Sequence, residues 1–254
     1  MPLSAFLRPF LILGLSAGFA GITIAKLLIA GNIRALLSWR TFQSHWFANF
    51  WTLFGPISAG MDAHKARAAV GAAYGVVLDL GPGSGLTVCH FDAAKVTKIY
   101  GVEPCVELHA QLQQRVAEAG LKDVYQILPC GAEELAAYGI ERESVDSVVC
   151  CKVLCGIPAP ERVTKELYAY TKPGGQFLVW EHVRNGRCTP IRGFQRVLQF
   201  VWPHLLQGCN INRPTDEILR NAGKWDSVAL GYDQEQSSWD PVPFVEGRLI
   251  KAKE

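Results

Sequence analysis

The sequence predicts a doubly wound α/β fold, with a mostly parallel seven-stranded sheet and an apolar helix before it. Three observations support this prediction. Short apolar segments alternate with segments of helical periodicity from about residue 62 onward, a glycine-rich turn follows the first apolar segment, and residues 9–31 contain a single charge. Such alternation is typical of parallel strands whose two faces are covered by crossover helices.

Length and charge limit the classes of protein that fit. A chain of 254 residues can form one α/β domain with an appendage. The net charge is only +2 and the basic residues are scattered, so nothing in the composition favours nucleic acid as a partner. The mean hydropathy of +0.13 is high for a soluble protein, and much of the excess lies in the first stretch of about thirty residues.

The N-terminal apolar segment runs from Pro9 to Gly31, and Lys26 is its only charged residue. As a helix it would extend about 34 Å, enough to cross a hydrocarbon core of about 30 Å. A cleaved signal peptide and a buried soluble helix are the alternatives. We expect residues 1–31 to form a retained membrane anchor. Basic residues after the apolar stretch favour a cytosolic location for the rest of the chain.

The next segment, Ile33 to Phe54, is rich in aromatic residues at three- and four-residue spacing, which predicts a helix with one broad aromatic face. Two interpretations remain open. The helix could lie in the lipid headgroup layer, or it could pack on the following domain and cover its pocket. We therefore expect an interfacial aromatic helix over residues 32–60 and a catalytic domain over residues 61–254.

The remaining elements follow in chain order. Helices are expected at residues 62–73, 107–119 and 160–170, where Gly120 provides an end signal and Pro160 a start signal. Residues 172–175 should form a turn. The expected strands are residues 76–78, 99–102, 124–128, 145–151 and 176–180, with residues 227–230 and 248–252 as closing strands.

The glycine-rich turn carries Gly81, Gly83 and Gly85, and Asp79 precedes it. Glycine allows a tight turn and close approach of the backbone to a ligand. The third glycine follows the second after two residues, whereas dinucleotide-binding enzymes usually need three. Glu103 lies eighteen residues after Gly85, at the end of the next expected strand. A carboxylate in that position can accept hydrogen bonds from both hydroxyls of a ribose.

These features resemble those of the class I S-adenosylmethionine (SAM)-dependent methyltransferases, in the same order over about residues 76–183. The matching motifs are Asp79–Gly85, Tyr100–Pro104, Ala132–Leu135, Ser144–Val149 and Lys172–Phe177. The resemblance implies a Rossmann-like fold and SAM as cofactor. It also implies that SAM is held by Asp79, Gly81, Gly83, Gly85, Glu103, Gly131, Ala132, Glu133 and Cys151. Many relatives carry Asp where Gly131 stands, so the adenine contact must come from the backbone of Gly131 and Ala132 or from Glu133.

Three further segments resemble the membrane-anchored methyltransferase-like seven family of thiol S-methyltransferases. They are Val149–Cys155, Trp180–Val183 and Trp202–Asn210. The resemblance implies an anchor in the endoplasmic reticulum or lipid droplets, a catalytic domain on the cytosolic face, and a small lipophilic thiol as acceptor. Methylation of a hydroxyl, quinone or lipid is an alternative. A membrane scaffold that binds SAM without turnover is another.

A thiol acceptor needs little help from a base, since its reference pKa is about 8.5. His182, just past the fifth strand, is the first candidate for that base, although it could instead be a structural histidine at the strand end. His204 is the second candidate. We expect Cys155 to line the acceptor pocket, which residues 194–206 would shape.

The chain has eight cysteines, without the paired C-x-x-C spacing that is typical of zinc sites. Three of them lie within or beside one apolar strand. We therefore expect reduced, mostly buried thiols and no metal.

Overall fold

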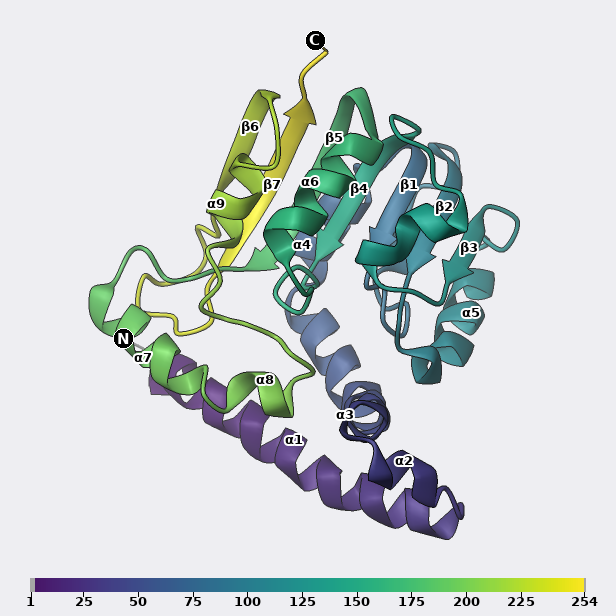
Figure 1. The fold of residues 1–254 in the computed structure, drawn as a ribbon. Coiled ribbons are helices and arrows are strands. Elements are labelled where there is room, and N and C mark those ends of the chain that lie inside the picture. Colours follow the sequence, from purple (N-terminus) through teal and green to yellow (C-terminus); the bar gives the residue numbers. More distant parts are fainter. Residues whose placement is uncertain (1–2, 254) are drawn as a thin grey trace.

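The computed structural model describes residues 3–253, with side chains from residue 6 onward. Its centre is one seven-stranded sheet in the order β3-β2-β1-β4-β5-β7-β6, in which β7 is antiparallel to both neighbours (Figure 1). This arrangement confirms the predicted fold class. The strands are β1 Gly75–Leu80, β2 Val96–Val102, β3 Tyr125–Leu128, β4 Val145–Cys151, β5 Thr171–His182, β6 Trp225–Tyr232 and β7 Phe244–Lys251.

Helices cover both faces of the sheet and extend below it (Figure 1). The N-terminal helices are α1 Leu3–Ile29, α2 Ile33–Leu37 and α3 Trp39–Met61. Those of the α/β domain are α4 Ala63–Val70, α5 His109–Glu118, α6 Pro160–Tyr170, α7 Thr189–Leu198, α8 Trp202–Leu205 and α9 Thr215–Arg220. Short 3-10 turns are η1 Val88–His90, η2 Val106–Leu108 and η3 Ala132–Tyr138.

Two apolar clusters sandwich the sheet because successive strand residues point to opposite faces. Val77 and Ile99 pack with α4 and α5 on one face. Leu78 and Val148 pack with α6, α9 and η3 on the other. Strands buried on both faces must be apolar throughout, which is why β1 and β4 could be recognised in the sequence.

The strand order reverses between β1 and β4. The chain first adds β2 and β3 on one side of β1, and then adds β4 and β5 on the other side. In open α/β sheets, ligands bind beyond the carboxyl ends of the strands at such a reversal. Leu80 of β1 is paired with Val102 of β2, so the glycine turn and Glu103 leave the sheet side by side.

The aromatic segment forms two helices, so the prediction of one helix over residues 33–54 is wrong. Ser38 is extended and separates α2 from α3, and its hydroxyl accepts the amide N–H of Thr41. Serine is a preferred helix N-cap for this reason. Helix α3 then packs on the domain through Phe50, which is 1% exposed beside Trp202 and Leu198.

Helix α1 lies against α3, α7 and α8 (Figure 1). Near its start, a guanidinium N–H of Arg8 donates to Asp240 at 2.8 Å. In its middle, the Ser16 hydroxyl donates to the carbonyl oxygen of Leu205, and the Trp46 indole N–H donates to the carbonyl oxygen of Ser16. These contacts fix one face of α1 on the domain.

The same face continues to the end of α1. Asn49 of α3 donates to the hydroxyl of Thr23 at 3.1 Å, and the ammonium of Lys26 donates to the Asn49 side-chain oxygen at 2.6 Å. Residues 8, 16, 23 and 26 follow helical spacing, so they form one polar stripe that faces the protein.

The structure differs from the sequence-based prediction at the start of β5 and around α7 and α8. Residues 172–175, expected as a turn, lie within β5, which starts at Thr171 and has a shift in its pairing with β4. Residues 194–206, expected as one segment around the acceptor, divide between α7 and α8, and Phe200 between them is exposed.

Candidate active site

The glycine turn has the conformation that its sequence predicts. Gly81 and Gly83 both have φ of +58°, a region that favours glycine. A Cβ on Gly81 would lie 2.5 Å from a methyl group of Val153, and one on Gly83 would lie 3.2 Å from the indole nitrogen of Trp51. The turn is therefore enclosed by the loop after β4 and by α3. Gly85 ends it, also with positive φ.

The side chain of Glu103 is hydrogen-bonded directly to this turn. Its carboxylate accepts the N–H of Gly83 and the N–H of Cys105, both at 2.8 Å. The residue is 6% exposed, and burial raises the pKa of its carboxyl group, while the two backbone N–H donors oppose that shift. A carboxylate has about four acceptor positions, so two hydroxyls can still bind beside these two amides.

Asp79 is buried at the end of β1. Its carboxylate accepts the hydroxyl of Tyr125 at 2.7 Å. Burial raises the pKa of Asp79 to about 7; the bond from Tyr125 lowers it, and the charge of Glu103 adds to the rise. Through this hydrogen bond, Asp79 of β1 is joined to β3 across β2.

The residues expected around adenine lie at the end of β3. The N–H of Gly131 donates to a carboxylate oxygen of Glu134 at 3.0 Å, where η3 begins. Ala132 is buried and Glu133 is exposed. Cys151, the last residue of β4, is half-buried.

Helix α3 crosses the carboxyl edge of the sheet, where it contributes Trp51 and contacts Lys152 of the loop after β4; the sequence did not single out either residue for the site. Trp51 lies beside Gly83, as described above, and stacks on Phe47 with ring centroids 5.4 Å apart. The Lys152 ammonium donates to the hydroxyl of Ser58 at 2.8 Å and lies 4.5 Å from the centre of the Trp180 ring. Helix α3 packs over the domain, as one of the two interpretations of the aromatic segment expects.

Lys152 has φ of +58° directly after β4. Burial lowers the pKa of its ammonium group, which nearby Asp62 opposes. The aromatic spacing in the sequence could have suggested Trp51, but nothing in the sequence marks Lys152.

At the carboxyl ends of β4 and β5, the structure brings together one residue from the end of β5 and two from different loops. The Sγ of Cys209 lies 3.2 Å from the Sγ of Cys155 and 3.5 Å from Nδ1 of His182. Cys155 is 4% exposed, whereas His182 and Cys209 are half-buried. The contact with Cys209 and burial both raise the pKa of the Cys155 thiol, which the neighbouring imidazole of His182 opposes.

His204, the second histidine expected at the site, is exposed on α8. Within the described part of the chain, its only hydrogen bond outside the local helical turn is from Gln43 to its backbone oxygen. The structure therefore does not join His204 to His182.

Glu181 orders the loop that carries Cys155. One carboxylate oxygen accepts the N–H groups of Val153 and Leu154, at 2.8 and 2.9 Å. Burial raises the pKa of Glu181 to about 7, and those two N–H groups oppose the shift. Because Val153 also contacts Gly81, this loop links the glycine turn to the cysteine and histidine cluster.

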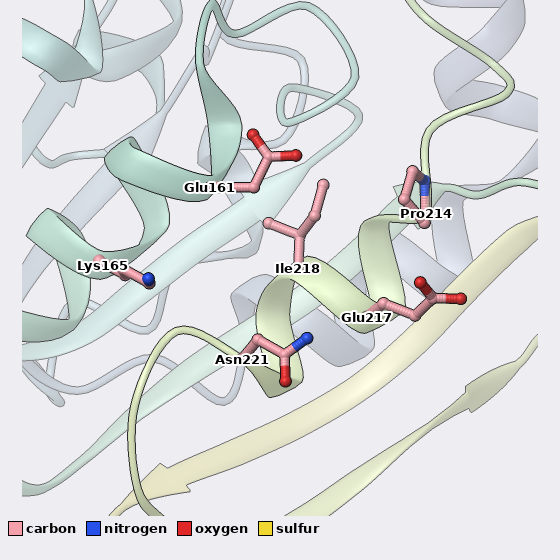
Figure 2. Close-up of a pocket in the computed structure, with 6 residues that line it drawn as sticks. All are labelled: Glu161, Lys165, Pro214, Glu217, Ile218 and Asn221. Carbon is pink, nitrogen blue, oxygen red and sulfur yellow. The ribbon is translucent and has the colours of Figure 1, made fainter.

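A separate hollow between α6 and α9 is lined by Glu161, Lys165 and Ile218, among others (Figure 2). It contains none of the residues expected to bind cofactor or acceptor.

Comparisons with known proteins agree with this geometry. Residues 78–179 match a family described as methyltransferase domain. Thiol S-methyltransferase TMT1B of Rattus norvegicus is 28% identical over 176 residues, which cover 69% of this chain and 70% of that protein. Thiol S-methyltransferase TMT1A of Homo sapiens is 36% identical over 109 residues, 42% of this chain and 44% of that protein.

A solved structure shows the same fold. An O-methyltransferase family protein from Burkholderia thailandensis has a TM-score of 0.57 at 18% identity, covering 84% of this chain and 61% of that chain. With the sheet order and the glycine turn beside Glu103, these matches place the chain among the class I SAM-dependent methyltransferases.

Proposed function

We propose that this methyltransferase transfers the methyl group of SAM to a small lipophilic thiol at the membrane surface. The observation that carries the proposal is the loop after β4, which touches the glycine turn through Val153 and presents Cys155 beside His182. The relatives named as thiol S-methyltransferases support the choice of a thiol.

The residues present fit SAM. Gly81, Gly83 and Gly85 have the positive φ that a tight turn around a ligand requires, and Glu103 retains acceptor capacity for ribose hydroxyls. In this proposal Gly81, Gly83, Gly85 and Glu103 hold the cofactor, and Asp79 supports the turn. Gly131, Ala132 and Glu133 lie on the adenine side, and Cys151 borders the site. SAM supplies a methyl group on a sulfonium, which is a good leaving group.

The protein's own contribution is alignment, because an in-line displacement with a good leaving group gains most from positioning and exclusion of water. Helix α3 closes the site over Gly83 through Trp51. In this proposal His182, at the end of β5, lies beside the acceptor. A thiol acceptor has the smallest need for a base, because its reference pKa is lower than that of a phenol or an alcohol.

For the membrane, we propose that α1 lies in the interface instead of crossing the bilayer. Residues 6–29 are long and apolar enough to span. However, α1, which is about 40 Å long, is hydrogen-bonded to the α/β domain at Arg8 and Ser16. At Thr23 and Lys26 it is hydrogen-bonded to Asn49 of α3. A spanning helix would have to break most of these bonds.

The opposite face of α1 supports the same orientation. It is apolar and exposed, with Leu11 72% and Ile29 89% exposed. Other exposed apolar residues of α2, α3, α7 and the turn after α7 add to the apolar surface, namely Leu37, Trp39, Leu53, Val197 and Phe200. Contiguous exposed apolar surface is typical of membrane-binding sites. We propose the cytosolic face of the endoplasmic reticulum or of lipid droplets as the location.

An acceptor screen tests this function. Release of S-adenosylhomocysteine is measured with matched alkyl thiols, alcohols and phenols from about pH 7 to 9. We expect turnover with thiols that rises as the thiolate fraction grows. Turnover with phenols or alcohols but not with thiols would contradict the thiol proposal and indicate a hydroxyl acceptor. SAM binding without turnover of any acceptor would favour a non-catalytic scaffold.

A further inference from the structure

The cluster of Cys155, His182 and Cys209 has the composition of a metal site. It offers two thiols and one imidazole nitrogen, and these three atoms lie within 4.8 Å of one another. The three residues come from the loop after β4, the end of β5 and the loop after α8. Sulfur and imidazole ligands select thiophilic divalent cations over magnesium or calcium.

We propose that Cys155, His182 and Cys209 bind a zinc ion and leave its fourth position open for the acceptor thiol. In a tetrahedral zinc site, bonds of about 2.3 Å to sulfur and 2.0–2.1 Å to nitrogen place two sulfurs about 3.8 Å apart, and sulfur and nitrogen about 3.5 Å apart. The Cys209–His182 distance is already 3.5 Å. The two sulfurs, at 3.2 Å, need to separate by only about 0.6 Å.

The backbone around the cluster is well fixed, as a preorganised site requires. The N–H of Asn210 donates to the carbonyl oxygen of Cys155 at 2.9 Å, which joins the two cysteine loops. The hydroxyl of Thr215 donates to the carbonyl oxygen of His182 at 2.7 Å. Glu181 holds the two amides that precede Cys155.

Three protein ligands and one open position are typical of catalytic zinc, whereas structural zinc sites are closed by four. This cluster contains three candidate ligands among the described residues, and two of them are half-buried, so one side is accessible. The loop of Cys155 also contacts Gly81 through Val153, which places the cluster near the cofactor turn. A thiol bound there would lie on the acceptor side.

The role of the fourth ligand rests on the proposed thiol methylation. An acceptor thiol that binds zinc releases its proton to water, and its sulfur becomes the fourth ligand. A carbon–sulfur bond then forms between this sulfur and the methyl group. The bond from the methyl group to the sulfonium sulfur breaks, and that sulfur keeps the electron pair. The thioether product is a neutral, weaker ligand and leaves. His182 acts here as a ligand, not as a base.

Metal content tests the site independently of turnover. Full-length protein is prepared in detergent with reductant, loaded with zinc, desalted and measured by elemental analysis. We expect about one zinc per chain, and a loss of at least about tenfold in Cys155→Ser and in Cys209→Ser. Cys89→Ser, at an exposed cysteine outside the cluster, should retain the metal. Absence of zinc in the parent protein, or zinc retained in both cluster variants, would overturn the site.

Cobalt then tests the open position. Cobalt substituted for zinc has a thiolate-to-metal charge-transfer band, whose intensity should increase when an alkyl thiol is added and stay unchanged with the matched alcohol. An unchanged spectrum with both would overturn the role of the fourth position. Full thiol turnover by metal-free protein would overturn the catalytic role and leave the proposed function standing. Bound zinc without any thiol turnover would instead reject the proposed function.

Discussion

Glu103 connects the ends of two neighbouring strands through the amides of Gly83 and Cys105. Replacing it with alanine removes the acceptor for the ribose and frees the glycine turn. We expect SAM affinity to fall by about 1 to 3 kcal/mol, since charge-assisted hydrogen bonds are lost. Titration calorimetry measures this change. The exposed Glu118→Ala on α5 should bind like the parent protein.

Glu103→Gln keeps one acceptor oxygen for the two backbone N–H groups and turns an NH2 donor toward the other. Its unfolding temperature should fall less than that of Glu103→Ala, while SAM affinity falls in both variants. Equal SAM affinity in Glu103→Ala, Glu103→Gln and the parent would remove Glu103 from the cofactor site.

Asp79 makes stability depend on pH. Its pKa is about 7 in the folded chain, against an ordinary value of 3.8. Between these values the folded state binds more protons than the unfolded state, so the free energy of unfolding falls as pH rises from about 4 to 7. The full effect is on the order of 4 kcal/mol. The groups that face Asp79 are Tyr125 of β3 and Glu103.

Asp79→Asn should remove this part of the pH dependence, because asparagine can still accept the Tyr125 hydroxyl. Urea unfolding of the SAM-free protein at pH 5 and pH 8 measures it, with the exposed Asp123→Asn as control. The same decline with pH in Asp79→Asn and in the parent would show that Asp79 is ionised without penalty.

At the level of residues, the sequence predicted the site residues that belong to short local motifs. The glycine turn and Glu103 were recognisable because each depends on a strand end and a spacing. The Cys155, His182 and Cys209 cluster was not, since its members lie 27 and 54 residues apart and meet only in the folded chain. Asp79 was expected to bind cofactor, and its burial with Tyr125 could not be read from the motif.

At the level of elements, α3 should contribute to the stability of the whole domain. Phe50 is 1% exposed in the cluster with Trp202, so Phe50→Ala should lower the free energy of unfolding by about 3 to 5 kcal/mol. Leu53→Ala on the exposed side of the same helix should change it by about 0.5 kcal/mol or less. Denaturant unfolding of the two variants measures the difference.

An equal, small effect of both substitutions would mean that α3 does not pack on the domain. A large effect of Phe50→Ala together with retained SAM binding in buffer would show that α3 stabilises the fold without closing the cofactor site.

The strands were predicted because burial on both faces requires continuous apolar segments, as in Val145–Cys151. Helix boundaries were harder. Ser38 interrupts an aromatic pattern that continues in sequence, and a single capping serine does not reveal whether a helix stops there. The extension of β5 back to Thr171 depends on pairing with β4, which a local glycine-rich pattern does not report.

At the level of the whole molecule, α1 determines how the enzyme meets the membrane. If α1 lies in the interface, both of its ends stay in the cytosol. An N-glycosylation acceptor sequence added at the N-terminus should therefore remain unmodified in microsomes, as should one at the C-terminus. The positive control is the same tagged chain preceded by a cleavable signal peptide, which directs the tag into the microsome lumen, where it is glycosylated. Glycosylation of the N-terminal tag alone would show that α1 spans the bilayer.

The apolar face of α1 provides the matching variants. Leu11→Glu and Leu28→Glu place charges on exposed positions and should release the protein from membranes without unfolding it. Replacing Glu118 with lysine, on a helix of the α/β domain, should leave flotation with liposomes unchanged. Membrane binding that survives both α1 substitutions would locate the anchor elsewhere.

The most direct test of the account follows one methyl group. SAM with a deuterated methyl group is incubated with the full-length protein and an alkyl thiol, and the products are identified by mass spectrometry. We expect a labelled thioether and an equal amount of S-adenosylhomocysteine, both lost in Gly83→Val, whose side chain would block the turn beside Trp51. A labelled product on oxygen or nitrogen with no thioether, or undiminished thioether from a folded Gly83→Val variant, would contradict it.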